Sequence, residues 1–197
     1  MSMQEKNNSY TLTKFLLIGR IKGSGYFKIF GKGRSDMRRM VLSILVDNTS
    51  GVLSRVSGLF SRRGYNIDSV SVAETENPMF SRMTVAVTGE EQILEQIEKQ
   101  LQKLEDVREI TELSDSNSVC RELVLVMVQA DATRRQEVIA VANIFRANIV
   151  DVAPETLMIE LTGNQAKVDA FIRLLDGFTI QKLVRTGVTG LIRGQED

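Results

Sequence analysis

One order of predicted elements occurs twice in this sequence, and this internal repeat restricts the fold more than any other feature. In the first copy, hydrophobic periodicity predicts strands at 41–46, 65–73, 81–88 and 107–113, and helices at 52–63 and from Gly89 onward. In the second copy it predicts strands at 122–129, from Asn148, at 156–162 and at 180–184, and helices at 134–146 and from Gly163. The β-α-β-β-α-β order predicts a four-stranded antiparallel sheet with two helices on one face.

The two copies carry local signals that separate them into domains. Val52, Val56 and Phe60 fall on one face of the first predicted helix, and Gly64 is placed to end that helix as a C-cap glycine. A polar, turn-forming stretch of sequence SDSNS separates the copies. We therefore predict an α+β protein of two ferredoxin-like βαββαβ domains, at 37–113 and 121–197, joined by a linker at 114–120. A copy of about 75 residues buries a small core, so we expect copies to pair into larger sheets.

Composition narrows the class of protein. Of the 197 residues, 43% are hydrophobic and 25% charged, as in soluble globular proteins. The formal net charge of zero gives no reason to expect nucleic acid or an acidic membrane surface as a partner. No apolar run approaches the ~18 residues of a membrane span. The one cysteine cannot form an internal disulfide, and we therefore expect a cytoplasmic protein.

The first 36 residues differ from the rest because they are rich in Lys, Arg and Gly. The organised pattern begins only at Met37. We expect residues 1–36 to be mostly disordered, as an extension of artificial origin or a misassigned upstream segment. A transit peptide and an ordered extension are the alternatives.

The sequence contains no recognisable set of catalytic residues. The chain has no histidine, and Cys120 lies in the predicted linker with no imidazole to activate its thiol. No paired carboxylates, metal-ligand cluster or P-loop stands out. The sequence therefore favours a binding protein over a small ferredoxin-like enzyme, and it predicts no catalytic residue, no metal site and no cofactor in this chain.

The strongest candidate for binding is the loop DNTSG at residues 47–51, between the first strand and the first helix. Such residues are also ordinary in a turn, and Ser50 could cap the helix. In the binding interpretation, Gly51 lets a ligand approach the backbone, Asn48 supplies an amide, and the helix start attracts a carboxylate or phosphate. The matching loop of the second copy, QADATR at 129–134, lacks the glycine. This difference favours a special role for the first loop and predicts that the two copies are not equivalent sites.

Asn66 is a second candidate, at the start of a predicted edge strand. It could reach a ligand held across a strand-paired interface, although a helix-to-strand connection would use the same residues. Asn148 occupies the matching place in the second copy, where the ordinary connection explains it well.

Several stretches resemble the small, regulatory subunits of acetohydroxyacid synthase, also called acetolactate synthase. The matching segments are MRR at 37–39, DNTSGVLSRV at 47–56, GLFSRRGYNI at 58–67, FSRMT at 80–84, EQIEKQL at 95–101, IFR at 144–146, IVDV at 149–152 and RTGV at 185–188. The resemblance covers roughly residues 37–194 and not residues 1–36.

This resemblance implies an N-terminal ACT domain that binds a branched-chain amino acid, usually valine, and a C-terminal ACT-like domain. It further implies a homodimer through the ACT domains and a catalytic large subunit as partner. Thiamine diphosphate, Mg and FAD are expected in that large subunit, which condenses pyruvate into acetolactate. The small subunit would activate it and confer feedback inhibition.

The family's effector contacts map onto Asn48, Gly51 and Val52 at the first loop, and onto Asn66 and Ile67 at the next strand, with Asn66 reached from a neighbouring protomer. Val52 is a departure, because many members have alanine there, and the resemblance therefore does not fix effector preference. The alternative function is a stand-alone ACT-type amino-acid sensor that regulates another enzyme or a transcription factor.

Overall fold

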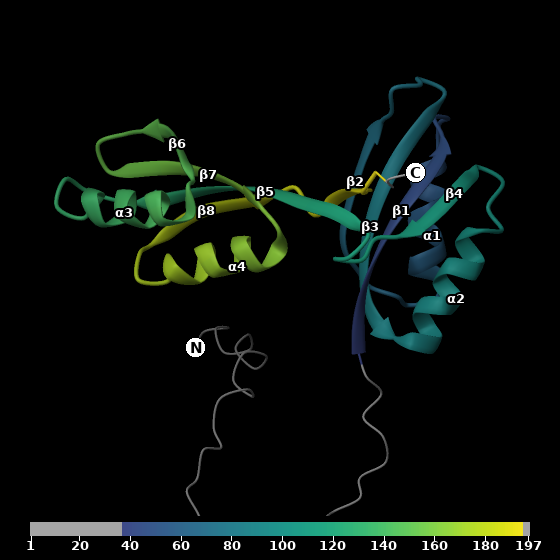
Figure 1. Cartoon of the computed structure of the whole chain (residues 1–197). Coiled ribbons are helices and arrows are strands. Elements are labelled where there is room, and N and C mark those ends of the chain that lie inside the picture. The colour runs from purple at the N-terminus through teal and green to yellow at the C-terminus, as the bar shows by residue number, and fades with distance from the viewer. Residues whose placement is uncertain (1–36, 195–197) are drawn as a thin grey trace, which may run out of the picture. The chain divides into compact units, whose positions relative to one another are not determined.

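The computed structural model describes residues 37–194, and in it the first repeat folds as predicted (Figure 1). Its elements are β1 (Met37–Asp47), α1 (Val52–Arg62), β2 (Ile67–Glu74), β3 (Phe80–Glu90), α2 (Glu91–Leu101) and β4 (Val107–Glu112). The strands pair antiparallel in the order β2-β3-β1-β4, which leaves β2 and β4 at the two edges. Both helices pack on one face of this sheet.

The alternation of buried and less buried residues along β1 explains why the helices pack on that face. Met40, Leu42, Ile44 and Val46 are at most 1% exposed, and they share a core with the apolar side of α1 and α2. Gly64 has φ of 68°, a backbone conformation that glycine adopts without strain, and it ends the turn after α1 as predicted. The predicted bounds shift slightly: β2 begins at Ile67, and α2 begins at Glu91 because Gly89 belongs to β3.

The second repeat has the same topology (Figure 1). It consists of β5 (Ser118–Gln129), α3 (Arg135–Phe145), β6 (Asn148–Val152), β7 (Thr156–Gly163), α4 (Gln165–Leu174) and β8 (Ile180–Arg185). The strand order β6-β7-β5-β8 corresponds to β2-β3-β1-β4 of the first repeat. A separate core fills the space under α3 and α4, where the rings of Phe145 and Phe171 meet edge to face at 5.4 Å.

A ninth strand, β9 (Thr189–Ile192), was not predicted. It pairs antiparallel with the first residues of β5, so that Cys120 lies opposite Gly190. A Cβ at Gly190 would lie 2.7 Å from the Cys120 sulfur, so glycine is the residue that fits there. Residues 118–120 therefore belong to a strand instead of the linker, and the prediction that Cys120 lies in a linker was wrong.

The described residues belong to one compact unit, and the expectations for residues 1–36 lie outside them. No helix within residues 37–194 is long and apolar enough to cross a membrane.

Candidate functional site

The loop between β1 and α1 leaves the start of the helix open. Gly51 is the N-cap residue, with φ of 85° and ψ of −6°, and it offers no side chain to the first amides of α1. The first turn of α1 contains no acidic residue. The first N–H groups of α1 thus have no side-chain cap, and together with the positive end of the helix dipole they are suited to bind a carboxylate.

Gly51 is required by this geometry for two reasons. Its positive φ is strained for residues with a side chain. A Cβ at position 51 would also lie 3.0 Å from the Nη1 atom of Arg55, whose backbone N–H donates to the Gly51 carbonyl at 2.9 Å.

Two bidentate ion pairs hold the loop from the β4 side. Arg55 donates to both carboxylate oxygens of Asp106 at 2.6 and 2.7 Å, and Arg108 donates to Asp47 at 2.7 Å through Nε. The backbone N–H of Asp47 donates to the carbonyl of Asp106 at 2.9 Å, which joins the two pairs. The guanidinium of Arg55 lowers the pKa of Asp106. Sequence reasoning missed these residues, because the partners lie 51 and 61 positions apart.

Asn48 contacts its own domain. Its Nδ2 donates to the Pro78 carbonyl at 2.9 Å and to Glu74 at 3.2 Å, while its Oδ1 accepts from the Ser81 hydroxyl at 3.0 Å. Its backbone N–H donates to the Met79 carbonyl at 2.8 Å. Asn48 therefore fastens the β2–β3 hairpin to the loop, a structural role that the sequence did not reveal.

Val52 and Ile67 both pack against the core of the first repeat. The Val52 side chain is 3% exposed and belongs to the core, so what it presents to the loop is its backbone N–H. The half-buried Ile67 packs against the same core. The extra bulk of valine over alanine is accommodated inside the domain.

The structure does not bring all five predicted residues together within one chain. Asn66 is exposed and precedes β2, whereas Asn48 lies beside the far end of β2, next to Glu74. Eight strand residues separate these ends, a distance of roughly 25 Å. Asn48, Gly51 and Val52 therefore form one cluster, and Asn66 and Ile67 form another.

The matching loop of the second repeat is closed by its own carboxylate. Asp131 Oδ1 accepts from the backbone N–H groups of Thr133 and Arg134, both at 2.9 Å. The Thr133 hydroxyl, at 2.6 Å, and these amides lower the pKa of Asp131. At α4, the Asn164 side chain caps the helix by accepting from the Lys167 N–H at 3.0 Å. The loop before α1 thus lacks the side-chain acceptor that Asp131 supplies in the matching loop, although α2 also begins without a side-chain cap.

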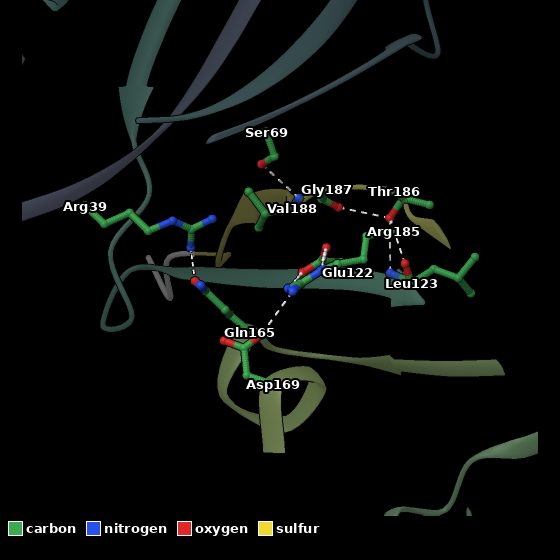
Figure 2. A network of polar contacts seen from close by, with 10 residues as sticks. All are labelled: Arg39, Ser69, Glu122, Leu123, Gln165, Asp169, Arg185, Thr186, Gly187 and Val188. Atoms are coloured by element: carbon green, nitrogen blue, oxygen red, sulfur yellow. Dashed lines mark hydrogen bonds and ion pairs between the residues drawn. The ribbon is translucent and has the colours of Figure 1, made fainter. Parts of the chain in front are cut away.

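A second polar region connects the two repeats (Figure 2). Glu122 is 6% exposed and accepts two hydrogen bonds from Arg185 at 2.7 Å, and Arg185 also donates to Asp169 at 3.0 Å. Arg39 of the first repeat donates to Gln165 of the second. Arg39, Glu122, Gln165 and Arg185 line a polar cavity of about 550 Å³. Because the carboxylates pair with guanidinium groups, this region has the character of a structural contact. Within residues 37–194, no three His, Cys, Asp or Glu side chains gather as a metal site would require.

Comparison with known proteins identifies both repeats. Residues 42–109 match the model of the AHAS small subunit-like ACT domain, and residues 121–194 match the model of the small subunit of acetolactate synthase. The acetolactate synthase small subunit of Mycobacterium bovis is 51% identical over 153 residues, covering 78% of this chain and 91% of the relative. The isozyme 3 small subunit of Salmonella typhimurium is 49% identical over 159 residues, covering 80% and 98%. The crystal structure of the small subunit from Thermotoga maritima superposes with a TM-score of 0.74 at 40% identity, covering 81% and 99%.

Proposed function

This chain belongs to the family of acetolactate synthase small subunits, and from that premise we propose that it is the non-catalytic regulatory subunit of the enzyme. It would activate the catalytic large subunit and inhibit it when a branched-chain amino acid, with valine as first candidate, is abundant. Thiamine diphosphate, Mg and FAD would be held by the large subunit, which performs the condensation of pyruvate. We propose a cytoplasmic location for the complex.

The observation that carries this proposal is the uncapped start of α1 at Gly51. An amino acid has a carboxylate that suits the free amides of Val52 and its neighbours. In the second repeat, Asp131 already supplies a carboxylate to the matching amides. The first repeat leaves that position available for a ligand.

The distance between Asn48 and Asn66 favours a site shared by two protomers. β2 is an edge strand, and its side chains Val70 and Val72 are 41% and 44% exposed. Such an edge favours pairing with another strand. If two copies of β2 pair antiparallel about a twofold axis, Asn66 of one copy approaches the Glu74 end of the other, where Asn48 lies.

This arrangement would let a ligand act on assembly geometry. An effector bound between two chains stabilises the dimer arrangement for which it has higher affinity. It regulates the catalytic subunit to the extent that the two arrangements differ in their affinity for the effector and for that subunit.

The test is reconstitution. Incubated alone with pyruvate and the cofactors, the purified chain should form no acetolactate. Added to its catalytic subunit, it should raise turnover, and valine should then lower it. Acetolactate made by the isolated chain would overturn the non-catalytic role.

Calorimetry on the isolated chain tests the effector directly. Valine should bind, and it should raise the melting temperature by mass action, since it favours the folded state. Co-purification separates this function from the alternative of a stand-alone sensor. A regulatory subunit should co-purify with the catalytic subunit of acetolactate synthase, whereas a sensor for another enzyme should co-purify with that enzyme.

A further inference from the structure

The short segment 186–188, which follows β8, touches β2 of the first repeat. Ser71 Oγ donates to the Val188 carbonyl at 2.9 Å, and the Val188 N–H donates to Ser69 Oγ at 3.4 Å. Val188 is 7% exposed. Because Ser69 and Ser71 alternate with Val70 on β2, both hydroxyls lie on the same side of that strand (Figure 2 shows the Ser69 contact).

The same segment is fixed to the second repeat at its other end. Arg185 is held by Glu122 and Asp169, and the Leu123 N–H donates to Thr186 Oγ1 at 3.1 Å (Figure 2). After Val188 the chain continues into β9, which pairs with the start of β5. Segment 186–188 is therefore held between β2 on one side and the β5 sheet on the other.

Gly187 makes this contact close. It has φ of 77°, and a Cβ at this position would lie 2.8 Å from the Ser69 Cβ and 3.3 Å from its hydroxyl. A side chain at 187 would be strained and would push β2 and the segment apart. Any shift of β2 must in turn move segment 186–188, because two hydrogen bonds and this close approach join them.

We propose that segment 186–188 transmits the effector signal from β2 to the C-terminal repeat. This inference rests on the proposed function, in which the effector acts where β2 edges of two protomers meet. Movement of β2 on effector binding would shift Val188 and Gly187, and through Arg185 it would shift Glu122 in β5. The polar cavity beside Thr186 and Gly187 leaves room for such a shift.

The test compares Gly187→Ala with Gly177→Ala in the reconstituted enzyme, with L-valine as the probe. Gly177 is the matched control, since a Cβ there would meet nothing within 4 Å and its φ is not in the positive region. For Gly187→Ala we expect the valine Kd of the isolated subunit to stay within about twofold. The valine-dependent inhibition of the complex should fall about 3- to 10-fold, a size typical of lost coupling between sites. Gly177→Ala should match the wild type in both.

A second variant guards against a folding defect at Gly187. Ser69→Ala combined with Ser71→Ala removes both hydroxyls without adding bulk, and it should weaken inhibition in the same direction while valine still binds. Inhibition equal to wild type in both variants would overturn the inference. A loss of inhibition explained fully by a weaker valine Kd in the isolated subunit would also overturn it, since the damage would then lie at the effector site. A wild-type chain that does not bind valine would overturn the proposed function itself.

Discussion

The loops after β1 and β5 occupy the same place in two copies of one fold, yet their helix starts differ. In the second repeat, Asp131 accepts hydrogen bonds from two loop amides. In the first, Gly51 leaves the amides of α1 without a side-chain cap. The comparison shows that one of these matching loops holds a carboxylate acceptor of its own and the other does not, and we attribute this difference to a binding role of the first loop.

The edge strands β2 and β6 resemble each other in the exposure of their valine side chains, whereas the loops after β1 and β5 differ. Val70 and Val72 on β2 are 41% and 44% exposed, and Val150 and Val152 on β6 are 48% and 59% exposed. Both strands are sheet edges. Edge pairing alone would therefore not assign the effector to the first repeat, and the assignment depends on the loop.

The largest effect is expected from giving the first loop a carboxylate of its own, as the second loop has. Gly51→Asp should abolish valine binding and inhibition while leaving activation largely intact. The new carboxylate would repel that of the ligand, and the side chain would be strained at a φ of 85° and crowded by Arg55. Calorimetry and inhibition assays measure the two losses.

Gly64→Asp is the matched control for that substitution. Gly64 lies beyond the other end of α1, its φ is also positive at 68°, and a Cβ there would meet nothing within 4 Å. The Gly64→Asp variant should bind valine like the wild type. If Gly51→Asp is still inhibited normally by valine, the effector site does not lie at this loop.

An intermediate effect is expected from removing single amides of the shared site. Asn48→Ala and Asn66→Ala should each weaken valine binding by about 2- to 13-fold, the equivalent of one hydrogen bond worth roughly 0.5–1.5 kcal/mol. Asn48→Ala also releases Ser81 and Pro78, so we expect it to loosen the β2–β3 hairpin. Asn66→Ala should leave the melting temperature unchanged.

Mixing the two variants sharpens this prediction. In a mixed dimer, one composite site carries both substitutions and the other carries neither. About one intact site per mixed dimer should therefore return, measured as valine binding of wild-type affinity. Verified mixed dimers without restored binding would argue for a site within one chain.

The smallest effect on the effector is expected from opening the second loop. Asp131→Ala should leave the valine Kd within about twofold of wild type, because that loop faces no effector in our proposal. It should lower the melting temperature, since two backbone N–H groups lose their acceptor. A large change in valine affinity would contradict the separation of the two loops.

The pH dependence of that stability loss has a definite sign. The Asp131 pKa is lowered in the folded protein, first by the Thr133 hydroxyl and then by the Arg134 amide. A lowered pKa stabilises the folded state above the ordinary value of 3.8, and the contribution fades as pH falls below it. The melting-temperature gap between wild type and Asp131→Ala should therefore be full near pH 7 and should shrink below about pH 4.

The sequence by itself determined the repeat and the order of strands and helices. It also singled out Asn48 and Gly51 in the first loop. Apolar periodicity and turn residues are local signals, so β1, α1 and their counterparts in the second repeat could be predicted. Gly51 was singled out because the matching loop of the second repeat, at 129–134, contains no glycine. The five effector residues stay predictions, which the experiments above test.

Only the tertiary structure decided what surrounds those residues. The pairing of Arg55 with Asp106, the fastening of Asn48 to Ser81, and the strand β9 all join positions distant in sequence. Such contacts depend on register and on which sheet edges meet, and neither leaves a periodic trace in the chain. The same holds for Gly187, whose need to be glycine comes from Ser69, more than a hundred residues away.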